Sequence, residues 1–140
     1  GSALVTGKVL QVIRASTTTA TATSSTSMVD ITSLTVNITP SATSSKIYVI
    51  MTVAGVSSAS SATSGATVQI YRASGFGTSI NMGYGSTNQL GINATLTALD
   101  SPSSTSELTY KGQMKNREAN SVSVNVSNDT SSITVMEIAG

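Results

Sequence analysis

Three residue types that carry much of protein chemistry are missing from this chain of 140 residues, which contains no His, no Cys and no Trp. Histidine is the side chain that most often transfers protons near neutral pH, and cysteine supplies thiolate nucleophiles and soft metal ligands. Their absence argues against an enzyme, and it excludes a disulfide framework and Cys-based metal sites. It leaves the redox compartment of the protein open.

Charged residues are scarce as well, at 9% of the chain with a net charge of +1. The seven basic residues are scattered, apart from a short cluster at Lys111, Lys115 and Arg117. This distribution does not predict binding to a phosphate backbone or an anionic membrane. No segment reaches the roughly 20 apolar residues that span a bilayer, and no signal peptide opens the chain. We therefore expect neither nucleic acid nor membrane insertion.

Small hydroxyl residues and β-branched apolar residues fill the chain instead. Ser and Thr account for 48 of the 140 residues, and Ile, Val and Leu for 30, whereas aromatic residues make up only 4%. The length predicts one domain, and the low aromatic content predicts a thin hydrophobic core. Because burial against identical copies supplements a thin core, we expect an oligomer.

The apolar residues recur mostly with period two, which indicates strands. No stretch of ten residues has the apolar spacing of a helix. The predicted strands are Leu4–Arg14, Met28–Thr39, Lys46–Val53, Ala66–Arg72, Ala94–Leu99, Glu107–Met114, 122–126 and Ile133–Ala139. Strands of this number joined by short turns predict an all-β fold, an antiparallel β-sandwich or jelly roll.

The connecting segments are rich in small residues. We expect Ala15–Ser27 to be weakly ordered or an edge strand, and Gly55–Gly65 to be a loop. Glycines at high density predict an irregular region over Ser74–Asn93. We expect Asp100 to open a turn, with its carboxylate bonded to nearby backbone N–H groups. A second turn is predicted at residues 128–129.

Four blocks of the sequence carry a family resemblance through their order and spacing. They read GKVLQVI, MVDITSLTVNITPSATSSKIYVI, ALDSPSSTSELTYKGQ and TSSITVMEIAG. Together they resemble the C-terminal domain of bacteriophage tail fibres and related virion receptor-binding proteins. The resemblance implies a homotrimeric, extracellular fibre head on the virion, which attaches through loops to a bacterial surface glycan or outer-membrane protein. We interpret residues 1–2 as a cloning scar and residues 3–140 as the fibre-tip domain.

Residues in the loops that match no pattern of this family are the candidates for receptor contact, since recognition is concentrated in variable loops. Aromatic faces stack on sugar rings, and amides offer hydrogen-bond donors and acceptors. The candidates are Phe76, Asn81, Tyr84, Asn88 and Gln89. Alternatively, the two aromatics fill the core or a trimer contact, and the amides have roles in turns. Tyr110 and Lys111 belong to a recognised block, which favours a scaffold role.

Six carboxylates are the remaining candidates for chemistry: Asp30, Asp100, Glu107, Glu118, Asp129 and Glu137. Their spacing selects no pair of the kind a glycosidase uses. Residues 125, 128 and 129 lack the acidic density of a calcium loop. We predict no catalytic residue, no metal and no cofactor. Two alternatives stay open: a purely structural trimerisation or capping domain, and a receptor-degrading glycan hydrolase or carbohydrate-binding accessory domain.

Overall fold

The computed structural model describes residues 7–58, 65–73, 76–82, 91–118 and 120–140. Within these residues the chain forms ten strands and one short 3₁₀ turn. The strands are β1 (Val9–Thr17), β2 (Thr21–Thr23), β3 (Val29–Ile38), β4 (Lys46–Ser58), β5 (Ala66–Arg72), β6 (Phe76–Met82), β7 (Ile92–Asp100), β8 (Leu108–Asn116), β9 (Val122–Val124) and β10 (Ser131–Ile138), and the turn η1 is Val126–Asn128.

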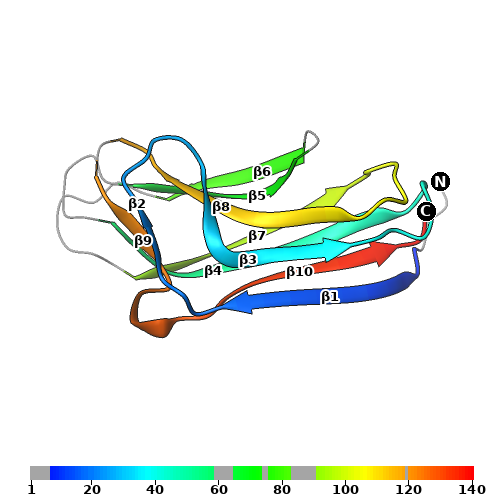
Figure 1. Ribbon diagram of the computed structural model, residues 1–140, viewed down its shortest axis with the longest axis horizontal. Coiled ribbons are helices and arrows are strands. Elements are labelled where there is room, and N and C mark those ends of the chain that lie inside the picture. Colours follow the sequence, from blue (N-terminus) through cyan, green and yellow to red (C-terminus); the bar gives the residue numbers. More distant parts are fainter. Residues whose placement is uncertain (1–6, 59–64, 74–75, 83–90, 119) are drawn as a thin grey trace, which may run out of the picture.

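Two antiparallel sheets pack against each other as a sandwich, which confirms the predicted fold class. The six-stranded sheet has the order β1-β10-β4-β9-β2, with β7 also paired to β4. The four-stranded sheet has the order β3-β8-β5-β6. Most strands run along the long axis of the molecule, and the short strands β2 and β9 lie towards one end (Figure 1).

Alternate residues of each strand point into the core between the sheets. In β4, for example, Ile47, Val49 and Met51 are fully buried. One close approach across the core requires a glycine. A Cβ atom at Gly112 of β8 would lie 2.5 Å from Leu34 Cδ2 and 2.9 Å from Met51 Sδ. The missing side chain therefore makes room for these two residues.

The predicted loop Gly55–Gly65 is wrong for its first four residues, which continue β4 to Ser58. Gly55 has a φ of 57°, a conformation that glycine adopts without steric cost. The register of β4 against β7 shifts between Val53 and Val56, and β4 then pairs with β9. The glycine thus allows a bulge within the strand. The small residues that follow it had predicted a loop instead. Residues 59–64 lie outside the described residues.

The predicted irregular region Ser74–Asn93 contains strand β6 and the start of β7. Strand β6 pairs with β5 at every residue from Phe76 to Met82, so Gly77 does not interrupt it. Residues 74–75 and 83–90 lie outside the described residues. Within the tract Ala15–Ser27, strand β2 pairs with β9 at the end of the six-stranded sheet, as predicted for an edge strand. Val126 belongs to η1 and not to a strand.

Asp100 was predicted to bond to nearby backbone N–H groups, but among the described residues its side chain is buried between the sheets and bonds to side chains instead. Its Oδ2 atom accepts hydrogen bonds from Arg72 Nε at 2.6 Å and from the Tyr110 hydroxyl at 2.7 Å. The hydrogen bond to Asp100 raises the pKa of Arg72. Burial, with help from Asp100, raises the pKa of Tyr110. Asp100 belongs to the six-stranded sheet and its partners to the other, so the cluster joins the two sheets.

A second buried carboxylate, Glu137 of β10, fixes the turn that follows β3. Its side chain is enclosed, with 1% of the residue exposed. Its Oε1 atom accepts three hydrogen bonds of 2.7 Å, from the backbone N–H and the hydroxyl of Ser41 and from the hydroxyl of Ser45. Oε2 accepts one from Gln11 Nε2 at 2.7 Å. Burial alone would raise the pKa of Glu137, but these hydrogen bonds lower it to about 2.

Candidate functional site

The outer face of the four-stranded sheet is polar, and we call it the polar face. Its side chains occupy the positions that alternate with the core positions of β3, β8, β5 and β6. They are Asp30, Thr35, Asn37, Thr67, Gln69, Tyr71, Ser79, Asn81, Thr109, Lys111, Gln113 and Lys115. This face offers a dense array of hydroxyl, amide and charged groups.

A chain of hydrogen bonds crosses three strands of the polar face. Gln69 Nε2 donates to Gln113 Oε1 at 2.7 Å, and Gln113 Nε2 donates to Asp30 Oδ1 at 2.7 Å. Lys111 Nζ donates to Asp30 Oδ2, also at 2.7 Å. Asp30 thus receives donors on both oxygens. The chain fixes the side chains of β3, β8 and β5 relative to one another.

A wide bulge in β3 interrupts the polar face beside Asp30. Asp30 pairs with Gln113 and Thr35 with Lys111, so four residues of β3 lie opposite one residue of β8. Ser33, within the bulge, has a φ of 60°, which is uncommon for a residue other than glycine. The bulge lifts β3 away from β8 and leaves space between them.

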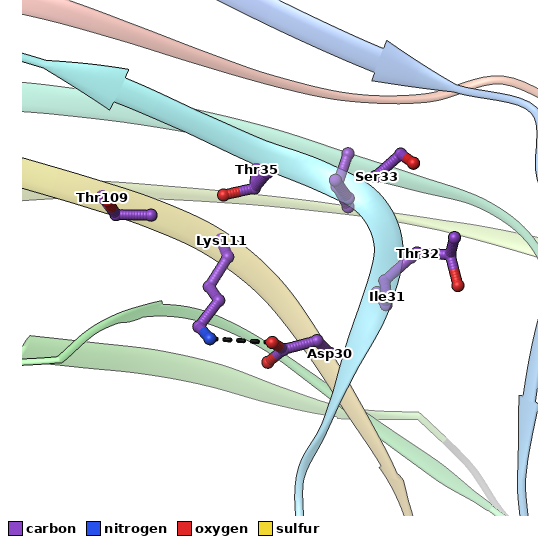
Figure 2. Close-up of a pocket in the computed structure, with 8 residues that line it drawn as sticks. Asp30, Ile31, Thr32, Ser33, Thr35, Thr109 and Lys111 are labelled. Atoms are coloured by element: carbon purple, nitrogen blue, oxygen red, sulfur yellow. Dashed lines mark hydrogen bonds and ion pairs between the residues drawn. The ribbon is translucent and has the colours of Figure 1, made fainter.

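This space is a pocket of about 280 Å³. Its lining consists of Asp30, Ile31, Thr32, Ser33, Leu34, Thr35, Thr109 and Lys111. Figure 2 shows Lys111 reaching from β8 to the carboxylate of Asp30. Pockets for drug-sized ligands measure about 300–1,000 Å³, so this pocket suits a group the size of one sugar ring.

The charged pair in the pocket stays accessible to a ligand, because the Asp30 side chain is 53% and the Lys111 side chain 30% exposed. Partial burial would raise the pKa of Asp30, but the hydrogen bonds from Lys111 and Gln113 outweigh it and lower the pKa. Lys111 Nζ also lies 5.8 Å from the centroid of the Tyr71 ring. The pocket therefore presents an ionised acceptor and a charged donor side by side.

The structure describes two of the five predicted contact residues. Asn81 is exposed on the polar face, where its Oδ1 accepts a hydrogen bond from the Thr67 hydroxyl at 2.6 Å. It lies on β6, at the opposite edge of the sheet from the pocket. Phe76 is half-buried and packs edge-on against Tyr110, with ring centroids 6.3 Å apart. The other three, residues 84, 88 and 89, lie outside the described residues.

Sequence reasoning missed the pocket, although one signal for it was present. Thr109, Lys111 and Gln113 alternate with the buried residues Tyr110 and Met114, which indicates a strand with one polar face. Tyr110 and Lys111 were both predicted to have a scaffold role. Tyr110 is buried, whereas Lys111 lines the pocket and is partly exposed. Finding the pocket also required the pairing of β8 with β3 and the bulge at Ser33, neither of which the residue types indicate.

Within the described residues no group of three or more acidic side chains lies close enough together to hold a metal ion. No helix in this part of the chain has the length and apolar character needed to cross a membrane. A scan against protein-family models and a search of curated proteins find no match for this chain. The candidate site therefore rests on its own geometry.

Proposed function

We propose that this chain is a non-catalytic attachment domain at the tip of a bacteriophage tail fibre, and that its homotrimer binds a glycan on the bacterial surface. The observation that carries the proposal is the pocket in the polar face, with Asp30 and Lys111 paired at its rim. The β-sandwich and the resemblance of four sequence blocks to fibre-tip domains agree with it. The proposed location of the protein is the virion.

The chemistry of the pocket suits a neutral, hydroxyl-rich ligand. Each sugar hydroxyl both donates and accepts hydrogen bonds, so neighbouring hydroxyls can bond to a carboxylate and an ammonium group at the same time. The Asp30–Lys111 pair has no net charge, and an anionic ligand would have to compete with Asp30 for Lys111. Thr35 and Thr109, which also line the pocket, carry further hydroxyls. These features favour a glycan over a phosphate.

A binding role also agrees with the state of the carboxylates. A glycosidase needs a general acid whose pKa is raised, together with a second carboxylate across the scissile bond. The pKa of Asp30 is lowered, and the group is held by two donors. Asp100 and Glu137 are buried and bonded to other protein groups. A homotrimer would present three such pockets and would gain avidity from weak individual contacts.

Binding of a fluorescently labelled chain to candidate host bacteria tests this proposal. We expect Lys111→Met to reduce cell binding by about tenfold, since hydrogen bonds to charged groups contribute about 1.5–3 kcal/mol. Lys8→Met is the matched control, because Lys8 is exposed and lies outside the polar face. A parent chain that binds no host, or a Lys111→Met variant that binds like the parent, would contradict the proposal.

Treatment of the cells separates the candidate receptors. Periodate oxidation of surface sugars should abolish binding, and protease treatment should leave it intact. The opposite pattern would indicate an outer-membrane protein. Release of reducing ends from host polysaccharide would indicate a hydrolase. A purely structural trimerisation or capping domain is the second candidate, because the large apolar side chains of Val12 and Leu99 are exposed on the outer face of the six-stranded sheet; trimers that bind no host would support it.

A further inference from the structure

The outer face of the six-stranded sheet carries a continuous row of apolar side chains. Val12 of β1 pairs with Met136 of β10, Met136 with Tyr48 of β4, and Tyr48 with Leu99 of β7. Paired residues in antiparallel strands have their side chains on the same face, with Cβ atoms about 4.5–5.5 Å apart. These four residues, which we call the apolar row, therefore cross the sheet from one side to the other without a gap.

Much of the apolar row is open to solvent in the single chain. Val12 is 56% and Leu99 55% exposed, and Met136 and Tyr48 between them are partly exposed. The paired residues Val9 and Ile138 extend the apolar surface beyond the row. Contiguous apolar surface of this kind marks interaction sites in soluble proteins. The outer face of the other sheet is also exposed, yet it is polar. Exposure alone therefore does not account for the apolar residues of this row.

We infer that a second copy of this chain packs on the apolar row, and that this face is the subunit interface of an oligomer. The apolar row and the rows beside it, which carry mostly hydroxyl residues towards Ser16, form a larger face. Four strands at about 4.8 Å spacing, over the eight residues from Val9 to Ser16 at about 3.4 Å each, give this face an area of about 500 Å². Two such faces bury about 1,000 Å², the area at which specific protein–protein interfaces begin. The face is therefore large enough for self-association.

The shape and charge of the face fit another copy of itself. Two sheets with the same twist pack face to face at a small angle, as the two sheets of this chain already do. Along the rows from Val9 to Ser16 the only charged side chains are those of Arg14 and Lys46, in the rows on either side of the apolar row. Their long side chains can reach solvent at the rim, which leaves an uncharged centre of the kind that interfaces favour.

One face packed on the same face of a second copy is a two-fold contact that pairs copies two at a time, so the inference does not rest on the trimer of the proposed function. The oligomeric state of the parent chain, measured by light scattering during size-exclusion chromatography, is the first test. We expect an oligomer, and we expect Val12→Glu and Leu99→Glu each to weaken association by about tenfold or more, because a buried unpaired charge opposes docking. Ser79→Glu is the control, an exposed position on the polar face. A monomeric parent, or charged variants that associate like the parent, would overturn the inference.

Engineered disulfides give a second readout that does not depend on weakening the fold. Val12 and Leu99 lie three strand spacings apart, about 14 Å, which is too far for a disulfide within one chain. The chain has no native Cys, so disulfides in a Val12→Cys, Leu99→Cys double variant must join separate copies. We expect covalent multimers on a non-reducing gel. Asn37→Cys with Ser79→Cys, also at opposite edges of a sheet, should remain monomeric; the reverse pattern would refute the interface.

The two proposals fail in different ways. A chain that binds host cells but stays monomeric would overturn the interface and leave attachment standing. A chain that associates through the apolar row but binds no host would overturn attachment and leave the interface standing.

Discussion

Replacement of Glu137 by Gln tests how much one buried carboxylate contributes to this fold. The substitution keeps the volume of the side chain but removes its charge. It also replaces one acceptor oxygen with an NH₂ group, which faces donors such as the Ser41 N–H or Gln11 Nε2. The serine hydroxyls can rotate to accept from that group, and the Gln11 amide can accept only if it flips and gives up its hydrogen bond to the Thr39 carbonyl. The backbone N–H of Ser41 cannot accept at all. We therefore expect loss of stability without loss of the overall fold.

The magnitude follows from the pKa of Glu137, which is lowered from the ordinary 4.5 to about 2. A difference of about 2.5 pKa units corresponds to ~3 kcal/mol in favour of the charged form in the folded state. Gln11 is partly exposed, and Ser41 is exposed, so in the variant water replaces part of the hydrogen bonding that these residues give to Glu137. We expect the free energy of unfolding to fall by about 2–3 kcal/mol at neutral pH.

The same linkage fixes the dependence on pH. Because the folded-state pKa is below the unfolded one, the contribution of Glu137 is fully present above about pH 4.5 and is lost as the pH falls towards 2. The difference in stability between the parent and Glu137→Gln should therefore be constant at neutral pH and shrink below pH 4.5. Stability at lower pH should change less in the variant than in the parent.

Urea unfolding at fixed protein concentration, repeated from neutral pH to pH 2, measures both effects. With a slope of about 1–3 kcal/mol per M, the midpoint of Glu137→Gln should fall by about 1–3 M at neutral pH. Glu107→Gln is the matched control, because Glu107 is exposed. A midpoint for Glu137→Gln equal to that of the control, or a difference that persists unchanged at pH 2, would refute this account of the buried carboxylate.

Two further substitutions test the core between the sheets. Gly112→Ala places a methyl group against Leu34, so we expect overpacking to cost about 1–3 kcal/mol; a melting temperature equal to that of the parent would contradict the close approach. Tyr110→Phe removes the donor to Asp100, and we expect a loss of about 1–3 kcal/mol in urea unfolding with unchanged binding to host cells. Unchanged stability would contradict the role of this cluster in joining the sheets.

The alternation of apolar residues was enough to predict the sandwich and several of its strands. Strand β5 has the predicted bounds, and β3 differs from the prediction by one residue at each end. The predicted loop and the predicted irregular region were wrong where segments rich in small residues form strands by pairing with neighbouring strands. Strand β6 carries Phe76, Ile80 and Met82 at alternating positions, but the glycines around it hid this period, and its pairing with the well-defined β5 holds it in place. Tertiary pairing there overrides what glycine and serine indicate locally.

The candidate site was harder to predict from the sequence, because it depends on the register in which β3 and β8 pair. Asp30 and Lys111 are 81 residues apart and meet only because β3 pairs with β8 and then bulges. Ser33 carries no signal for the positive φ that the bulge needs. Asp100 followed by Ser and Pro is typical of a turn, and its partner Arg72 lies on the other sheet. The alternation of residues shows which face of a strand is polar and which is apolar, but not which strands lie beside or across from one another.

The bulge in β3 assigns different tasks to adjacent residues. Ile31 and Leu34 point inward and are buried, whereas Thr32 and Ser33 point outward and are exposed. Thr35, which follows Leu34, also lines the pocket and is exposed. Its substitution can therefore change the chemistry of the pocket at a cost within about 0.5 kcal/mol, as is usual at exposed positions. Substitution of Leu34 would weaken the core. In related domains, substitutions at the outward residues could thus adapt the pocket to a different ligand, while the inward residues keep the shape of the pocket constant.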